Sequence, residues 1–386
     1  MKNISSNKKL VCTIVSHTPY AMGRNGTLVG LGPTVEEIDQ LANLFSKVYH
    51  CAPIYDSGAL PSYIRHKNNN VMVLPLKPAG GDSLFEKLNH ILQFPFNLMQ
   101  IKSCLKKSEF FHFRAPTGIG VLLLPLVILF WKKNAWIKYA GTWEDNSVPL
   151  SYKFQRWFLK IAPTRFKISI NSSPELYRGN IFELINPCFS KCRYMNSIKI
   201  AKQKTFDEKI NLLFVGRLEE AKGLGDLMSL IKQLKEVSRI NSLTVIGESK
   251  TKHLYENVSL GLPIKTIFTG PLPREEVFRY YEKSHILILL SKSEGFPKVI
   301  MESAAYGCVP IVSNIPDIKR KIKHMYNGFI LESNSGEIDS KEFNKILIDK
   351  TKLKFCSTNI HKDSKAYTFE NYLSQIKNAV LSNTFK

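Results

Sequence analysis

The sequence predicts an α/β protein of two domains, each built around its own parallel sheet. The chain has 386 residues, whereas one domain usually holds about 100–200 residues. Short apolar runs that fit buried strands alternate with longer segments of helical spacing. The alternation lapses in a polar, basic stretch and restarts at Ile210. We therefore expect a first domain at 1–190, a linker at 191–209, a second domain at 210–365 and a C-terminal helix at 366–386 that crosses back to the first domain.

The protein carries a large surplus of positive charge, with 54 Lys and Arg residues against 32 Asp and Glu residues and a formal net charge of +22. Binding to nucleic acid would come with a recognised module or with interleaved aromatic and basic residues, and the sequence has neither. Attraction to anionic lipid headgroups fits a protein that works at a membrane surface. A Lys-rich surface of the kind that an AT-rich genome encodes is the third interpretation. We expect no nucleic-acid partner, and peripheral contact with an anionic membrane stays open.

The cysteine pattern and the apolar runs indicate a cytoplasmic protein. The seven cysteines are odd in number, lack Cys-x-x-Cys spacing and complete no zinc site with histidines, so we expect free thiols in a reducing compartment. Met1 to Lys9 is polar and basic, which is not typical of a secretory signal. The strongest apolar run, 118–131, is shorter than the ~20 residues that span a bilayer. We expect a buried helix there, with the alternative that it lies on a membrane.

The first domain opens with the run Leu10–Ser16, which predicts a buried strand, and continues into a glycine-rich loop at 17–33. Behind this loop we expect a helix with Thr34 as its N-cap and Glu37 three positions after the cap. A loop of this kind lets a ligand approach the backbone closely, which makes Gly32 a candidate contact. The alternative is that the glycines serve turns only, because the spacing is a weak match to the dinucleotide-binding fingerprint.

Two further strand ends of the first domain carry polar side chains. One predicted strand places His112 and Arg114 near its carboxyl end, and another at 135–140 is followed by Glu144. Open α/β sheets bind ligands at this edge, and an imidazole there can move a proton or hydrogen-bond a hydroxyl. The alternatives are a histidine packed between aromatic residues and a solvated acid in a loop.

The second domain begins with the predicted strand Ile210–Val215, which is followed directly by Gly216 and Arg217 and then by Lys222. Both cations fall between the end of a strand and the start of a helix. Cations at this place can stabilise negative charge on a phosphate. The alternative is an ordinary surface pair of Arg and Lys.

The stretch Ser291–Ser313 carries the most information in the chain. An apolar run before it predicts a strand, Pro297 suits the first helical position, and Gly307 suits the C-terminal cap of a short helix. Glu294 lies in the loop and Glu302 lies in the helix, eight positions later. The first turn of a helix offers free N–H groups to a phosphate, and a carboxylate accepts hydrogen bonds from neighbouring sugar hydroxyls. The stretch therefore predicts a sugar-nucleotide site, with an ordinary βαβ turn as the alternative.

The string from Glu294 to Val312 resembles the signature of the retaining glycosyltransferases of the two-Rossmann-domain (GT-B) architecture, family four or group 1. That signature is a Glu, seven residues and a second Glu in a Glu-Gly-Phe-Pro context, then a small-residue helix and Gly-x-x-Pro-Ile-Val. The residues at 216–223 are similar to a second motif of that family, Gly-Arg-Leu followed by Lys-Gly. The resemblance is specific over Leu212–Ile330 and only architectural before about residue 190. It implies two Rossmann-like domains that face each other across a cleft.

The resemblance also implies roles for single residues. Glu294 would contact the donor sugar and Glu302 the ribose, while Arg217 and Lys222 would neutralise the diphosphate as it leaves. His112 stands where the family often has a His or Arg close to donor sugar and acceptor. The Asp-x-Asp metal motif of the other architecture is absent, so we expect no metal and no cofactor besides the nucleotide sugar as co-substrate. The other implied donor contacts are Gly216, Gly270, Leu272, Gly295, Phe296, Pro297, Lys298 and Val299, and those on the acceptor side are Gly32, Arg114 and Glu144.

The resemblance thus implies a hexosyltransferase that uses a UDP- or GDP-sugar and retains the anomeric configuration. Its acceptor would be lipid-linked or an oligosaccharide, in bacterial capsule, O-antigen or exopolysaccharide assembly. It would work in the cytoplasm or peripherally at the inner face of the plasma membrane. One alternative is a regulatory module that binds a nucleotide sugar without turnover. The other is a nucleotide-sugar epimerase or phosphorylase on the same fold.

Overall fold

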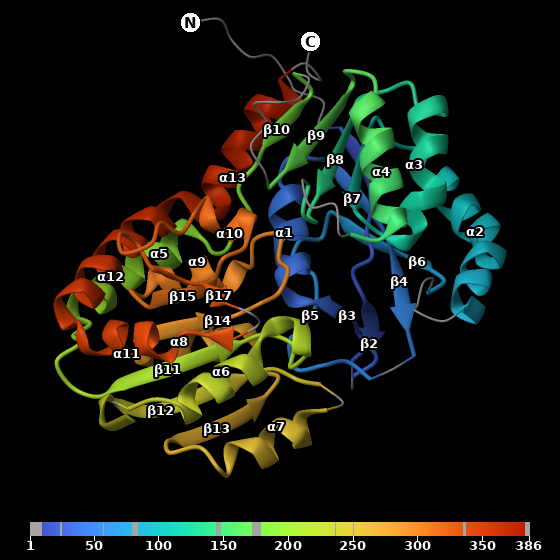
Figure 1. Cartoon of the computed structure of the whole chain (residues 1–386). Helices are drawn as coiled ribbons and strands as arrows, with labels where there is room; N and C mark the ends of the chain where they lie inside the picture. Colours follow the sequence, from blue (N-terminus) through green and yellow to red (C-terminus); the bar gives the residue numbers. More distant parts are fainter. Residues whose placement is uncertain are drawn as a thin grey trace, which may run out of the picture. The chain divides into compact units, whose positions relative to one another are not determined.

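The computed structural model (Figure 1) describes residues 10–23, 25–56, 58–78, 84–143, 148–171, 179–235, 237–249, 251–334 and 337–382. The chain divides into two compact units. The first unit combines Met1–Ile185 with Tyr372–Lys386, and the second is Asn186–Asn371. Each unit contains its own sheet of parallel strands. Within the described residues, no helix is both long enough and apolar enough to span a lipid bilayer.

The first sheet has the strand order of a Rossmann fold. Counted along the chain, its parallel strands lie in the order third, second, first, fourth, fifth, sixth and seventh. The order reverses between β1 and β7, which makes that place the topological switch point where open sheets bind ligands. In this spatial order the strands are β6 (Val71–Leu76), β4 (Lys47–Tyr55), β1 (Val11–Val15), β7 (Phe110–Ala115), β8 (Ala135–Tyr139), β9 (Phe166–Ile170) and β10 (Ile181–Glu183).

We predicted a loop at the glycine-rich stretch 17–33, and the structure shows a β-hairpin there instead. It forms the antiparallel strands β2 (Tyr20–Met22) and β3 (Leu28–Leu31), and β3 also pairs with β5 (Tyr63–Ile64). Backbone groups that were expected to face a ligand are therefore used within the sheet.

The helix behind this hairpin, α1 (Gly32–Ala42), begins three residues earlier than predicted, with Leu31 instead of Thr34 as its N-cap. Thr34 is therefore not its N-cap, because Pro33 already lies in the first turn, where its missing N–H has no partner. The Gly32 amide donates to the carbonyl oxygen of Ser62 at 3.0 Å. A Cβ on Gly32 would lie 2.6 Å from that oxygen, so this close approach of two backbones requires a glycine.

Helices cover both faces of the first sheet. Successive strand residues point to opposite faces, so Cys12 and Ile14 pack with α1 and the C-terminal residues, while Phe111 and Phe113 pack on the other side. The C-terminal segment consists of α13 (Phe369–Ile376) and a π-helical turn (Lys377–Leu381). The opposite face carries α2 (Leu84–Leu105), α3 (Gly118–Phe130) and α4 (Leu150–Ile161).

The second sheet repeats the Rossmann order with the strands β13, β12, β11, β14, β15 and β16, all parallel. Its switch point lies between β11 and β14. The strand bounds are β11 Ile210–Val215, β12 Ile240–Ile246, β13 Lys265–Gly270, β14 Ile286–Leu289, β15 Val309–Ser313 and β16 Phe329–Leu331, and a short pair β17 (Ser333–Asn334) and β18 (Glu337–Ile338) follows.

Part of the predicted linker 191–209 is a helix of the second unit, α5 (Lys191–Gln203). Ser190 caps it by accepting a hydrogen bond from the Arg193 amide at 3.2 Å. The polar composition concealed this helix, because only Tyr194, Ser197 and Ala201 are buried. The other helices of this unit are α6 Leu224–Lys232, α7 Lys252–Ser259, α8 Arg274–Lys283, α9 Lys298–Ala305, α10 Pro316–Lys319, α11 Ser340–Ile348 and α12 Lys350–Ser364.

Candidate active site

An ion pair bridges the switch point of the second sheet. The Lys222 ammonium, on the segment after β11, donates to the Glu294 carboxylate, on the loop after β14. Ser291 also donates to Glu294, at 3.1 Å. The side chains of Lys222 and Glu294 are 20% and 13% exposed, so both can be reached from solvent while they hold each other. Two residues predicted to act on the same substrate are thus in direct contact.

The position of Lys222 is set by the glycine that follows it. Gly223 has φ +73°, and a Cβ there would lie 2.0 Å from the carbonyl oxygen of Leu290. The Lys292 amide also donates to the Ala221 carbonyl at 2.9 Å. The segment after β11 is therefore pressed against the end of β14, and only a residue without a side chain fits at 223.

Replacing Gly223 with alanine is expected to lower the free energy of unfolding of the second unit by about 2 kcal/mol or more, because a Cβ at positive φ is strained and here also clashes with a carbonyl. Chemical denaturation followed by circular dichroism measures this loss. The matched control is Gly225→Ala in the exposed first turn of α6, where the nearest atom to an added Cβ is 3.9 Å away. That control is expected to be neutral or stabilising by up to about 1 kcal/mol. Equal effects of the two substitutions would contradict the packing argument.

Three glycines border the carboxyl edge of the second sheet next to this pair. The Gly216 amide donates to the Ile246 carbonyl oxygen at 3.0 Å, and the Gly247 amide donates to the Gly270 carbonyl oxygen at 3.1 Å. A Cβ on Gly247 would lie 1.8 Å from the Gly216 carbonyl oxygen. The edge from β11 to β13 is therefore lined by bare backbone, which a planar ring can approach closely. Gly216 and Gly270 were predicted as donor contacts, Gly247 was predicted only as a turn, and Leu272 lies half-buried just beyond.

The residues predicted around the start of α9 lie together. Phe296 is buried and stacks on Tyr367 with ring centroids 5.8 Å apart. Pro297 is the N-cap, one residue outside the predicted first helical position, and Gly307 ends the turn after α9 with φ +74°. The start of α9 carries the positive end of the helix dipole. The half-buried residues of the group are Gly295, Pro297, Lys298 and Val299.

Arg217 and Glu302, which were predicted to bind the same donor as Lys222 and Glu294, have other partners. The Arg217 guanidinium pairs with Glu219 at 2.9 Å, and its side chain is 72% exposed. Glu302 is buried, and its two oxygens accept hydrogen bonds from Arg274 at 2.6 Å and from the Tyr281 hydroxyl at 3.1 Å. Burial beside this carboxylate raises the pKa of Tyr281 well above its usual value. Arg274 and Tyr281, which both lie on α8, were missed by sequence reasoning because no recognised motif includes them.

His112 lies in the core of the first unit, which speaks against the predicted proton-transfer role. Its ring stacks on Trp136 with centroids 3.9 Å apart, and its Nδ1 lies 3.0 Å from the Trp136 carbonyl oxygen. The residue is 1% exposed, and burial lowers the pKa of His112 to about 3. The imidazole is therefore neutral at physiological pH. The alternative stated above, a histidine packed between aromatic residues, describes its surroundings.

Arg114 belongs to a buried charge cluster rather than to an open edge. It donates to Glu37 at 2.7 Å, and Lys138 donates to the same carboxylate oxygen at 2.7 Å. The Tyr372 hydroxyl of the C-terminal segment also donates to Glu37, at 2.9 Å. Glu37 is fully buried, so it serves as a central acceptor and not as the predicted capping-box residue. Glu144, the third predicted acceptor-side residue, lies outside the described residues.

A hydrogen-bonded chain of side chains at the switch point of the first sheet was not predicted. Asp39 contacts His66 Nδ1 at 2.6 Å, His66 Nε2 contacts the Tyr20 hydroxyl at 2.6 Å, and Tyr20 contacts His50 Nδ1 at 2.9 Å. His50 Nε2 lies 2.7 Å from Ser16 Oγ, directly after β1. An ionised Asp39 only accepts hydrogen bonds. With His66 neutral, each group therefore donates to the next one toward Asp39. Ser16 donates to His50, His50 to Tyr20, Tyr20 to His66, and His66 to Asp39.

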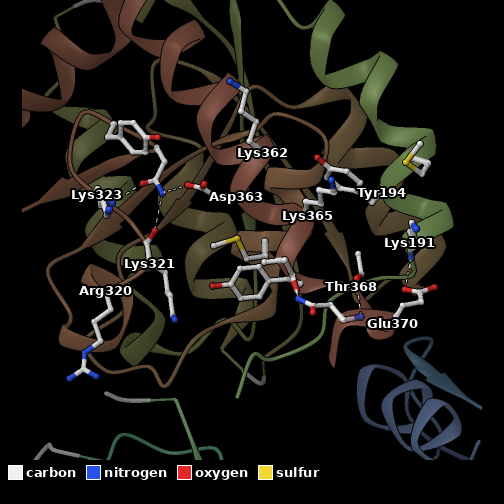
Figure 2. Close-up of a pocket in the computed structure, with 17 residues that line it drawn as sticks. Lys191, Tyr194, Arg320, Lys321, Lys323, Lys362, Asp363, Lys365, Thr368 and Glu370 are labelled. Carbon is white, nitrogen blue, oxygen red and sulfur yellow. Dashed lines mark hydrogen bonds between the residues drawn. The ribbon is translucent and has the colours of Figure 1, made fainter. Parts of the chain in front are cut away.

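The second unit also contains a basic cavity of about 830 Å³ that shares no residue with the predicted donor site. Figure 2 shows cationic side chains that reach it from separate segments. Its two acids are engaged, since Asp363 accepts from Asn327 at 2.8 Å and Glu370 accepts from the Lys191 amide at 2.8 Å. The basic lining residues are Lys191, Arg320, Lys321, Lys323, Lys362 and Lys365. In the part of the chain that the structure describes, no three His, Cys, Asp or Glu residues are grouped to hold a metal ion.

The structure is similar to known two-domain enzymes. It superimposes on sucrose-phosphate synthase from Thermosynechococcus elongatus with a TM-score of 0.71 at 14% identity, covering 97% of this chain and 99% of that chain. It superimposes on HepE from Anabaena in complex with UDP and glucose with a TM-score of 0.69 at 13% identity, covering 97% and 100%. These likenesses confirm the predicted GT-B fold with two Rossmann-like domains.

Sequence comparisons point to one family. Residues 196–363 match the family described as glycosyl transferases group 1. The chain is 29% identical over 160 residues to an uncharacterized glycosyltransferase of Haemophilus influenzae, which is 41% of this chain and 43% of that protein. The chain thus spans less than half the length of that curated relative. It is 23% identical over 328 residues to the GalNAc-alpha-(1->4)-GalNAc-alpha-(1->3)-diNAcBac-PP-undecaprenol alpha-1,4-N-acetyl-D-galactosaminyltransferase of Campylobacter jejuni, 81% of this chain and 87% of that protein.

Proposed function

Because residues 196–363 match the glycosyl transferases group 1 family, we propose that this chain acts as a member of that family and transfers a hexosyl unit from a nucleoside-diphosphate sugar to an acceptor hydroxyl with retention. The observation that carries the proposal is the Lys222–Glu294 pair at the switch point of the second sheet. A cation and a carboxylate held side by side at a ligand-binding edge offer one partner to a phosphate and one to a sugar hydroxyl.

The chemistry assigns each group a place. During transfer, the bond between the anomeric carbon and the diphosphate oxygen breaks, and a bond from that carbon to the acceptor oxygen forms. The nucleoside diphosphate takes up negative charge as its bond to the sugar breaks, and the acceptor hydroxyl gives its proton to an oxygen of this leaving group. Lys222 and the N–H groups at the start of α9 stabilise that charge. Glu294 binds hydroxyls of the sugar, and Arg217, which is solvent-exposed and follows the same strand as Lys222, adds a second cation.

We propose a UDP- or GDP-sugar as the donor. The three glycines Gly216, Gly247 and Gly270 leave backbone without side chains that suits the flat face of a nucleobase. HepE, which has the same fold, holds UDP and glucose. Glu302 then contacts the ribose from inside its hydrogen-bonded group with Arg274 and Tyr281. In this proposal the donor sugar exchanges places with the Lys222 side chain at Glu294, since both compete for the same carboxylate.

For the acceptor we propose a lipid-linked or free oligosaccharide in the assembly of a bacterial cell-surface polysaccharide. The name of the Campylobacter jejuni relative specifies an undecaprenol-linked acceptor. A relative from Erwinia amylovora, 29% identical over 133 residues, is a glycosyltransferase of amylovoran biosynthesis, and the match covers 32% of each chain. Both support a carbohydrate acceptor that grows one sugar at a time.

Thermal unfolding of the purified protein with UDP-, GDP-, ADP- and dTDP-sugars tests the donor. A donor that binds the native state raises the unfolding temperature, by mass action. Release of nucleoside diphosphate from that donor is then measured with and without an oligosaccharide acceptor. Acceptor-dependent release is the expected result. Binding without release would indicate a regulatory module, and conversion of the donor without any acceptor would indicate an epimerase or phosphorylase.

A further inference from the structure

The solvent face of helix α4 is apolar. Leu150, Phe154, Trp157 and Ile161 are 81%, 40%, 56% and 47% exposed. Their spacing of four, three and four residues puts all of them on one side of the helix. The solvent side of a helix in a soluble protein usually carries charged residues. Helix α4 differs, because its solvent side carries four apolar side chains.

The orientation of α4 is fixed by its opposite side. Gln155 is buried and donates to the Thr117 carbonyl at 3.0 Å, and Arg156 is buried and donates to the Trp143 carbonyl at 2.6 Å. Leu159 packs into the core of the first unit. The helix therefore cannot turn its apolar face inward without breaking these buried contacts.

The neighbouring helices extend the apolar surface. Helix α3 packs against both α2 and α4, and Figure 1 shows the three helices next to one another beside the first sheet. A contiguous exposed apolar patch is rare on a soluble monomer and marks an interaction site. The exposed apolar residues of α2 and α3 are Ile91, Leu92, Phe96, Met99, Leu129 and Phe130. We call these residues and the four of α4 the α2–α4 surface.

The charged side chains on α4 and just after α3 are all positive. Neither helix contains an acidic residue. Lys153 and Lys160 of α4 are exposed and alternate along the helix with the apolar side chains, and the exposed Lys132 and Lys133 come just after the C-cap of α3. A lysine in this place can keep its stem on apolar surface and its ammonium among anionic groups.

We infer that the α2–α4 surface docks onto an anionic lipid membrane. A helix with exposed Trp, Phe and Leu between lysines has the composition of a segment that lies in the headgroup region, and each lysine near such a surface adds attraction to anionic lipid. A second copy of the chain fits less well, because two such faces would bring like charges together. The inference deepens the proposed function, since a lipid-linked acceptor resides in the membrane, but binding to vesicles requires no turnover and is tested separately.

The surface differs from the segment that the sequence singled out. The strongest apolar run, 118–131, mostly coincides with α3, whose residues Ile119, Leu123 and Leu124 are buried in the core. Of the large apolar side chains in this run, only Leu129 and Phe130 at its end are exposed. The more polar helix α4 carries the larger exposed stripe, because its apolar residues fall on the side away from the sheet.

Co-sedimentation of the full chain with vesicles tests the inference. We expect binding to vesicles of phosphatidylglycerol and phosphatidylethanolamine, and at least tenfold weaker binding to phosphatidylcholine vesicles. The double variant Phe154→Glu/Trp157→Glu is expected to lose at least tenfold in affinity for the anionic vesicles. The matched control Leu254→Glu/Leu260→Glu, at sites 53% and 85% exposed in the second unit, is expected to bind like the wild type. Lys153→Ala/Lys160→Ala should weaken binding by about fivefold for each lysine.

Tryptophan fluorescence gives a second readout that does not depend on a destabilising charge. Trp136 and Trp143 are buried and Trp131 is half-buried against the core, whereas Trp157 is 56% exposed, so insertion of Trp157 should shift the emission to shorter wavelength. Trp157→Phe should remove the shift and keep vesicle binding. No binding of the wild type to anionic vesicles, or equal binding by the folded Phe154→Glu/Trp157→Glu variant, would overturn the inference. A dimer in light scattering that this variant converts to a monomer would do so as well, because the surface would then be an interface between two copies.

Discussion

Replacement of Lys222 with alanine is expected to lower kcat by about 10²–10³-fold while leaving the fold intact. Loss of one preorganised group that stabilises charge in the transition state has an effect of this size. Lys222 is a partly exposed side chain whose partner is Glu294, and no core contact depends on it. Initial-rate measurements of nucleoside diphosphate release with a saturating donor separate the change in kcat from a change in KM.

The chain provides a matched control for Lys222 in the same two loops. Lys292, after β14, pairs with Glu220, beside Lys222, in an exposed ion pair that is the mirror arrangement of Lys222 and Glu294. Exposed pairs contribute little, so Lys292→Ala should keep kcat within about twofold of the wild type. Turnover of purified Lys222→Ala at the wild-type rate would disprove the charge-stabilising role, even if the protein remains a glycosyltransferase.

Replacement of Glu37 with glutamine is expected to lower the free energy of unfolding of the first unit by about 3–5 kcal/mol. The substitution keeps the shape of the side chain but removes the negative charge that Arg114 and Lys138 share in a fully buried place. An uncompensated buried charge is the main cost of breaking such a group. The Tyr372 hydroxyl keeps an acceptor, so the effect reports the charge rather than the hydrogen bond.

Urea denaturation followed by tryptophan fluorescence measures this effect on the right part of the chain. The protein has four tryptophans, and all four, at 131, 136, 143 and 157, belong to the first unit. Asp56→Asn is the control, since Asp56 is an exposed acid of the same unit. Its free energy of unfolding should stay within about 0.5 kcal/mol of the wild type. A loss below about 1 kcal/mol in Glu37→Gln would mean that Arg114 and Lys138 are relieved by other groups or by water.

Local signals account for the parts of the site that the sequence predicted. The strand before Ser291, the helix after Pro297 and the left-handed Gly307 each depend on a few adjacent residues, and the structure has all three. The Lys222–Glu294 contact joins two motifs whose residues were predicted to act on one substrate, because carboxyl ends of neighbouring parallel strands meet at one edge. The GT-B fold likewise followed from the alternation of strands and helices together with these motifs.

The parts that the sequence did not predict depend on distant partners. We predicted His112 at a ligand-binding edge because it lies near a predicted strand end. Both faces of this central strand pack on helices, so the sequence pattern does not show that His112 is buried against Trp136. Glu302 was predicted to contact the ribose, but its partners Arg274 and Tyr281, which come from another helix, were not predicted. The helix α5 was hidden because three small or aromatic contacts, not a continuous apolar stripe, hold it in place.

The chain of side chains from Asp39 to Ser16 has a second arrangement with the same atoms in the same places. If His66 takes up one proton, its Nε2 becomes a donor, and Tyr20 and then His50 reverse in turn. The Ser16 hydroxyl then swings from His50 to Thr18, which lies 2.8 Å away. The same positions of the heavy atoms therefore allow both directions of hydrogen bonding between Asp39 and the end of the central strand β1, and the two directions differ only in where the hydrogen atoms lie.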